Sequence, residues 1–462
     1  MPARFDLSDI ALRPHRGELA GSFRREAIGN AIRKALVVAI KVASLGFASL
    51  GLGLLAGTVV AIGQDPRPPA VTKGDTANGT APASAPPLPT IPIDRPSNDR
   101  PRKEPFAKEV LLGGDQNAAQ AAQAAKPVLR IRYRKSETRE LTIVGTPLVT
   151  AQDGGQMVLT DEGKLLVVQP ESVLAREAVD GPFAPIDEEE MGRRLLAELP
   201  TGFAIHRTKN YVIAHNTIPN YVRWVGTLFD SLHRGFHQYF KKQSWPLEKP
   251  DFPLVAIVFA DRASFETYAR EELGQASQTV IGYYNLETNR MITFYVPDAE
   301  RNVATLVHEA THQLAYNTGL QTRFADNPMW VSEGLAVFFE SPNFNNPSGW
   351  QGAGRVNRVN LLRFHDYVPR RSPTSLATLL SEDDRFRDPA TAADAYSEAW
   401  AFTYFLMRTQ KKEYIDFLKE LSQGKPLAQK NRLERIAQFE KALGVDLPTL
   451  DRKFMNFMST VQ

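Results

Sequence analysis

The chain has 462 residues, which is too long for one ordinary domain and long enough for two or three. Hydrophobic residues make up 43% and charged residues 23%, so at least part of the chain must be globular. The formal net charge of +3 argues against nucleic acid as a partner. The absence of cysteine excludes disulfides, a cysteine nucleophile and cysteine-ligated zinc, so any zinc site must use histidines and carboxylates.

Residues 42–63 contain no charged side chain and predict a transmembrane helix. A helix of this length spans about 33 Å, enough to cross the hydrocarbon core of a bilayer. Basic residues are frequent before this segment and scarce after it. The positive-inside rule therefore places residues 1–41 in the cytoplasm as a basic tail, and everything after residue 63 outside, on the periplasmic side in a bacterium. A cleaved signal peptide is the alternative, although the basic region is long and the apolar run exceeds the usual length.

Two segments of different composition follow. Residues 64–127 are rich in proline with nearly balanced charges, a composition that buries too little apolar surface to fold and predicts an extended linker. Residues 128–180 contain alternating runs such as VLRIRYR and ELTIVG, separated by glycine-containing turns, and predict a small antiparallel β module. The module shows no catalytic pattern, so we expect either a partner-binding unit or a structural spacer.

Residues 187–462 predict an α+β domain in which a mixed sheet is followed by helices. FAIHRT with YVIAHN and IGYYN with MITFYV read as two hairpins, and FPLVAIVFA reads as a buried strand. Helices are expected over 218–241 and 261–273, and the chain is mainly helical after about residue 298.

His308-Glu309-Ala310-Thr311-His312 is an HExxH motif on a predicted helix. Asp298 is expected to cap the start of this helix, and Gly319 to end it. Histidines four residues apart project from one helix face, about 5–6 Å apart at Cβ, so both can bind one tetrahedral zinc ion. Glu309 is positioned to take a proton from zinc-activated water. The alternative is a pair of ordinary helix histidines, but an HExxH arises by chance in roughly one of 100 such chains.

A third metal ligand should lie downstream. Glu333, within WVSEGLA, falls in a predicted helix that is apolar on most sides, where a carboxylate is costly unless it is paired. A zinc ion would remove that cost. Gly334 costs about 1 kcal/mol inside a helix, and close approach to the HExxH helix would explain it. Glu333 could instead be a surface or salt-bridged acid, and Asp326 and His365 are the rival ligands.

The sequence HEATH followed by WVSEGLA resembles the gluzincin, or thermolysin-like, group of zinc peptidases over roughly residues 200–410. It most resembles a set of uncharacterised bacterial peptidase-like domains in that group. The resemblance implies a zincin-like domain in which His308, His312 and Glu333 bind one zinc ion and Glu309 is the base. The ligand-orienting aspartate of thermolysin is not reproduced after Glu333. The Gly-x-Met-x-Asn element of related aminopeptidases is replaced by residues 282–285, which removes the argument for an aminopeptidase.

Two further features fit this group. An edge strand before the HExxH helix commonly pairs with extended substrate, and IGYYN and MITFYV are the candidates. Related enzymes often place an oxyanion-stabilising tyrosine on a later helix, where Tyr396 stands; a core aromatic is the alternative. His233 and His237 are also four apart, but Arg234 follows the first, so ordinary helix positions are favoured over a second metal site.

We therefore expect a membrane-anchored zinc metallopeptidase that cleaves peptide or protein substrates outside the membrane, with Glu309 and Tyr396 as catalytic residues. A zincin-fold protein that binds or acts as a scaffold without cleaving is the second hypothesis. A zinc hydrolase of non-peptide bonds is the third. Metal content together with a protease assay separates the first two.

Overall fold

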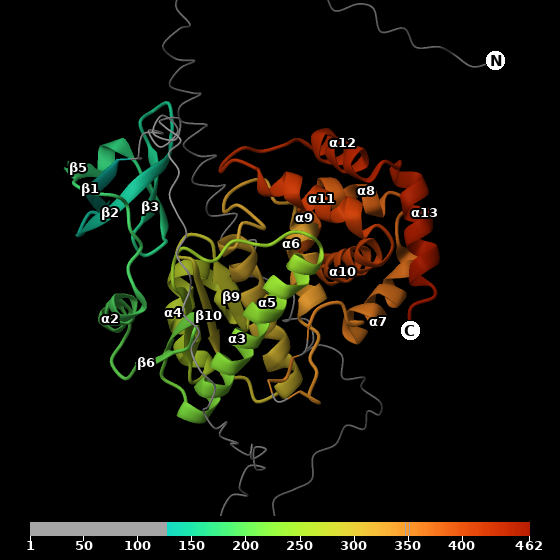
Figure 1. Ribbon diagram of the computed structural model, residues 1–462, viewed down its shortest axis with the longest axis horizontal. Coiled ribbons are helices and arrows are strands. Elements are labelled where there is room, and N and C mark those ends of the chain that lie inside the picture. Colours follow the sequence, from blue (N-terminus) through green and yellow to red (C-terminus); the bar gives the residue numbers. More distant parts are fainter. Residues whose placement is uncertain (1–126, 347, 351) are drawn as a thin grey trace, which may run out of the picture. The chain divides into compact units, whose positions relative to one another are not determined.

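The structure, a computed structural model, describes residues 127–346, 348–350 and 352–462 (Figure 1). The first elements form a five-stranded antiparallel sheet in the order β4-β3-β2-β1-β5. This β module consists of β1 (Val128–Ser136), β2 (Arg139–Thr150), β3 (Gln156–Thr160), β4 (Leu165–Val168), the 3-10 helix η2 (Pro170–Ser172) and β5 (Val173–Val179). Alternate apolar residues such as Ile131 and Tyr133 are buried on one face. The predicted antiparallel arrangement is confirmed.

A second, mixed sheet has the order β6-β7-β8-β10-β9. Its strands are β6 (Ala204–Arg207), β7 (Tyr211–His215), β8 (Leu254–Phe259), β9 (Gly282–Asn285) and β10 (Arg290–Phe294). Strand β8 runs parallel to β7 and β10, whereas β6–β7 and β9–β10 are the two predicted antiparallel hairpins. Of the two candidate edge strands, β10 lies inside the sheet and β9 lies at its edge.

Helices cover both faces of the mixed sheet, because successive strand residues point to opposite sides. Ile213 and Ala256 pack with α3 (Pro219–Lys242) and α5 (Ala299–Asn317). On the opposite face, Val212 and Val255 pack with three elements. These are α2 (Glu188–Glu198), α4 (Arg262–Leu273) and the 3-10 helix η3 (Gly274–Gln278). Every residue of β8 is buried, as its uninterrupted apolar run predicts for a central strand.

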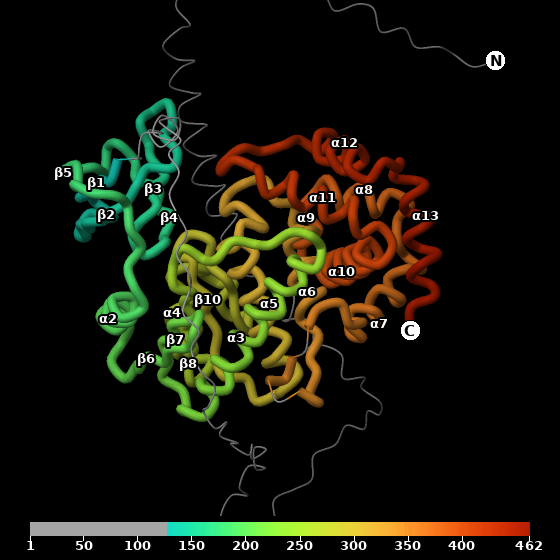
Figure 2. Tube along the Cα trace, viewed as in Figure 1, coloured from blue at the N-terminus to red at the C-terminus, as the bar shows by residue number. Residues whose placement is uncertain are grey.

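The rest of the chain is helical, as expected, and Figure 2 follows it in orange and red after α5. The elements are α6 (Met329–Phe339), α7 (Arg358–Tyr367), η4 (Val368–Arg370), α8 (Ser375–Ser381), α9 (Asp384–Arg387), α10 (Ala392–Thr409), α11 (Lys411–Ser422), α12 (Arg432–Leu443) and α13 (Leu447–Met458). One hydrophobic cluster runs from the sheet through α5, α6 and α10 to α13, and includes Leu314, Trp330, Trp400 and Phe454. This shared core holds α5 and α6 in a definite relation. The mixed α+β architecture matches the expectation.

The β module packs against the β9–β10 hairpin. The Leu165 N–H donates a hydrogen bond to the Glu287 carbonyl at 2.8 Å, between the start of β4 and the hairpin turn. Met157 and Leu165 share a buried cluster with Tyr284, which belongs to β9. Buried Arg290 of β10 also lies 3.5 Å from the Glu162 carboxylate of the module. These contacts hold the module against this hairpin.

No helix in the described part of the chain combines the length and apolar character needed to cross a bilayer. The predicted basic tail (1–41), the predicted transmembrane helix (42–63) and all but the last residue of the predicted linker (64–127) lie outside the described residues.

Candidate metal centre

Helix α5 carries the HExxH motif as the sequence predicts. The Asp298 side chain accepts a hydrogen bond from the Arg301 N–H at 2.8 Å and caps the first turn. The helix ends at Asn317, just before Gly319, which has a φ of 76°. Nearly every residue from 302 to 316 is buried, so the motif lies in the interior of the domain.

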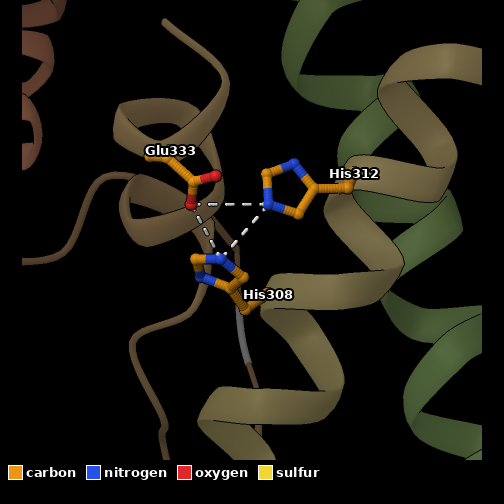
Figure 3. A group of neighbouring side chains, drawn as sticks. All are labelled: His308, His312 and Glu333. Atoms are coloured by element: carbon orange, nitrogen blue, oxygen red, sulfur yellow. Dashed lines mark hydrogen bonds and ion pairs between the residues drawn. The ribbon is translucent and has the colours of Figure 1, made fainter. Parts of the chain in front are cut away.

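The structure brings His308, His312 and Glu333 together (Figure 3). The Nε2 atoms of the two histidines are 3.2 Å apart, and the Oε2 atom of Glu333 lies 3.2 Å from the first and 3.6 Å from the second. Ligand atoms of a tetrahedral zinc site with bonds of about 2.0–2.1 Å are about 3.3 Å apart. The three atoms therefore match three corners of such a tetrahedron, and this group could hold a metal ion.

Helix α6 supplies Glu333, and every residue of this helix is buried. Gly334 does allow close approach of another helix, but the prediction that this helix carries the HExxH motif is wrong. The helix that packs against Gly334 is α10. A Cβ atom on Gly334 would lie 2.8 Å from the Ala399 carbonyl oxygen and would also collide with the Thr403 hydroxyl. Packing of α6 on α10 thus fixes the depth at which Glu333 is presented to α5.

Glu340 is a site residue that the sequence analysis missed. Its Oε2 atom lies 2.9 Å from Nδ1 of His308, and its Oε1 atom accepts a hydrogen bond from the Asn357 side chain at 2.8 Å. Asn357 in turn caps α7 by accepting a bond from the Asn360 N–H at 3.1 Å. Glu340 stands seven residues after Glu333, two helical turns along the same face. That spacing places both residues on one helix face, but by itself it does not indicate a contact with His308.

The carboxylates around His308 make the centre favourable for a cation. Burial alone would lower the pKa of His308, but its hydrogen bonds to Glu333 and Glu340 raise that pKa well above its usual value. Burial alone would raise the pKa of Glu333, but the two histidines lower it to about 2. Both shifts have the same cause, which is that the carboxylates and the histidines stabilise each other's charged forms.

Glu309 follows His308 on α5, and its charge interacts with His308, His312 and Glu333. Burial raises the pKa of its carboxyl group, and the nearby His308 and His312 lower it. The backbone N–H of Tyr284, in edge strand β9, also lowers this pKa, so the carboxylate lies beside that strand. Its Oε2 atom is buried and accepts no hydrogen bond from the described residues. The Glu309 carboxylate therefore lies close to both histidines and to the edge strand.

Tyr396, near the start of α10, lies beside these carboxylates. Burial, followed by the charges of Glu333 and Glu309, raises the pKa of its hydroxyl well above the usual value. A hydrogen bond to the Glu333 carboxylate contributes to the raised pKa, so the hydroxyl lies beside the metal-binding group as a donor. Its ring also packs edge-on against Phe386 at 5.4 Å, so the residue belongs both to the core and to the surroundings of the centre.

The rival metal ligands are engaged elsewhere or exposed. Asp326 accepts hydrogen bonds from the Arg435 guanidinium, and His365 is exposed on α7. The rings of His233 and His237 are 4.5 Å apart, but no acidic residue joins them in a metal-binding group among the described residues. Within that part of the chain, His308, His312 and Glu333 form the group suited to a metal.

A buried His-His-Glu group beside a buried glutamate defines this chain as a candidate metalloprotein. A model of a protein family of unknown function, DUF1570, matches residues 302–428. The matched segment contains His308, Glu309, His312, Glu333 and Tyr396. The family itself is uncharacterised. No curated protein matches the chain.

Proposed function

We propose that this chain is a zinc-dependent peptidase of the gluzincin type, with a zincin-like domain that holds zinc on His308, His312 and Glu333. The observation that carries the proposal is the triangle of ligand atoms, with sides of 3.2, 3.2 and 3.6 Å. A tetrahedral site with three protein ligands keeps its fourth position for water or substrate, which is the pattern of catalytic zinc.

The donor set fits zinc better than a hard cation. Two imidazole nitrogens and one carboxylate suit zinc, whereas magnesium and calcium prefer sites built of oxygen atoms. Bound zinc would polarise the scissile carbonyl group and lower the pKa of a water molecule to about 7.

The remaining residues take distinct roles in peptide hydrolysis. Glu309, with its unsatisfied buried Oε2 atom, accepts the proton of the attacking water and passes it to the leaving amine. Tyr396 donates its hydroxyl proton in a hydrogen bond to the oxyanion that develops on the substrate. Edge strand β9 pairs with the extended peptide and brings its carbonyl to this point.

The test compares the full chain with its Glu309→Gln variant. Both proteins should bind one zinc ion per chain, because Glu309 is not a ligand, and only the unchanged chain should cleave peptides. Glu333→Ala should lose zinc affinity, whereas the control Asp326→Ala should keep it. Wild-type turnover by the Glu309→Gln variant would refute the mechanism, and zinc affinity unaffected by Glu333→Ala would refute the ligand assignment.

A second candidate is a chain that binds metal without cleaving. One observation favours it: His308, Glu309, His312 and Glu333 are each at most 6% exposed. A peptide must reach these side chains before any cleavage can occur. One zinc ion per chain combined with no hydrolysis across a peptide library would select this candidate.

We further propose that residues 42–63 anchor the chain in a membrane, with the peptidase domain on the outer side. Support comes from the uncharged run and the excess of basic residues before it. Protease added to spheroplasts of the native host should degrade the region after residue 63, and the chain should resist carbonate extraction. A soluble product that starts near residue 60 would instead show a cleaved signal peptide.

A further inference from the structure

Arg323 is a half-buried cation in the loop between α5 and α6, and no carboxylate among the described residues pairs with it. Burial lowers the pKa of its guanidinium, and the Tyr284 phenol partly offsets that effect. Its guanidinium donates a hydrogen bond from Nη1 to the Leu286 carbonyl at 3.2 Å. A neutral carbonyl satisfies one of the five N–H donors of the guanidinium and leaves its charge uncompensated.

Three other buried or half-buried arginines have carboxylate partners, unlike Arg323. Arg290 pairs with Glu198 at 2.7 Å, Arg371 with Glu398 at 2.7 Å, and Arg435 with Asp383 at 3.1 Å. In these three cases an acid offsets the cost of burying the charge. Arg323 has no such acid among the described residues.

The place of Arg323 links it to the metal centre. Leu286, to which it donates, directly follows β9, the edge strand whose Tyr284 N–H lies beside Glu309. The distance along the strand from residue 284 to residue 286 is about 7 Å. Phe324, the next residue in the loop, packs in one cluster with Tyr284 and Leu286. A peptide that pairs with β9 would pass Arg323 one or two residues from the bond opposite Glu309.

We propose that Arg323 is a specificity residue that binds a carboxylate of the substrate, so that the site selects acidic peptides. The ligand group is either an acidic side chain or the carboxyl terminus, because both present the same pair of oxygens to the guanidinium fork. This proposal rests on the proposed pairing of substrate with β9.

The experiment measures peptide binding to the full-length, zinc-loaded Glu309→Gln chain, in which hydrolysis is blocked. The probes are six-residue peptides that carry glutamate or glutamine at each position in turn, each prepared as free acid and as amide. At one position, or at the free terminus, the carboxylate form should bind about 30- to 100-fold more tightly than its neutral match. The preference should weaken as ionic strength rises.

Variants at Arg323 assign the effect. Arg323→Gln should abolish the preference and bind neutral peptides as before. Arg323→Lys keeps the positive charge and loses the guanidinium fork, so it should retain part of the preference for carboxylates. An unchanged melting temperature of each Arg323 variant shows that the protein still folds. Arg408→Gln is the matched control, because Arg408 also donates to a backbone carbonyl, that of Gly354 at 2.7 Å. It should leave the preference unchanged.

The outcomes separate this inference from the proposed function. Equal binding of acidic and neutral peptides overturns the role of Arg323, whether or not the unchanged chain cleaves them, and so does an acidic preference that survives Arg323→Gln. Selective binding of acidic peptides without cleavage by the unchanged chain supports the subsite and contradicts the peptidase. A preference for free acids over amides identifies the carboxyl terminus as the bound group, and a preference for glutamate identifies a side chain.

Discussion

Replacing Glu340 by glutamine should weaken zinc binding by about 10- to 100-fold, although Glu340 is not a ligand. Its carboxylate lies 2.9 Å from Nδ1 of His308 and holds the ring with Nε2 toward the other ligands. Both side chains are buried, and hydrogen bonds to charged groups contribute about 1.5–3 kcal/mol, so the expected loss agrees with that range. Glutamine keeps the shape and loses the charge that makes His308 a stronger ligand.

The assay is competition for zinc between the protein and a chelator of known affinity, combined with the melting temperature of the metal-free protein. Asn357→Ala should reduce affinity in the same direction by a smaller factor, because Asn357 holds Glu340 at 2.8 Å. The double variant should lose less than the product of the two single effects. Glu382→Gln is the control, since Glu382 pairs with Arg432 at 3.0 Å. Unchanged zinc affinity in Glu340→Gln would refute the reasoning, as would an equal loss in Glu382→Gln.

Tyr396→Phe should lower kcat by about 100- to 1000-fold with little change in KM or zinc content; normal turnover with a lower melting temperature would make it a core residue only. Gly334→Ala should destabilise the fold by about 1–3 kcal/mol in urea unfolding, because its Cβ meets Thr403 and the gain in helix propensity is only about 1 kcal/mol; a more stable variant would contradict this packing. Burial alone would raise the pKa of Glu198, but its hydrogen bonds to Arg290 lower it to about 2. Because the folded-state pKa is depressed, the stabilisation is present above pH about 4.5 and disappears as the pH falls toward 2. The stability difference between the unchanged chain and Glu198→Gln should follow that course, and a difference independent of pH would contradict it.

The local features of the site could be predicted from the sequence because hydrogen bonding within a helix fixes their spacing. His308 and His312 lie on one face of α5 because an α-helix has 3.6 residues per turn. Asp298 caps that helix by accepting a hydrogen bond from the N–H three residues further along the chain. Glu333 was also within reach of sequence reasoning, since a carboxylate in an apolar helix signals a partner. The same local rules predicted the two hairpins of the mixed sheet.

Contacts between elements were decided by the tertiary structure. Sequence spacing did not show that Glu340 reaches His308, because this contact depends on the angle and depth at which α6 packs on α5. The neighbour of Gly334 proved to be α10 for the same reason. Likewise, both strands of the β9–β10 hairpin were candidates for the edge until the parallel pairing of β8 with β10 left β9 outermost. Such choices depend on how side chains across the whole core fill space together, whereas the spacing within one helix or hairpin is fixed by its own backbone hydrogen bonds.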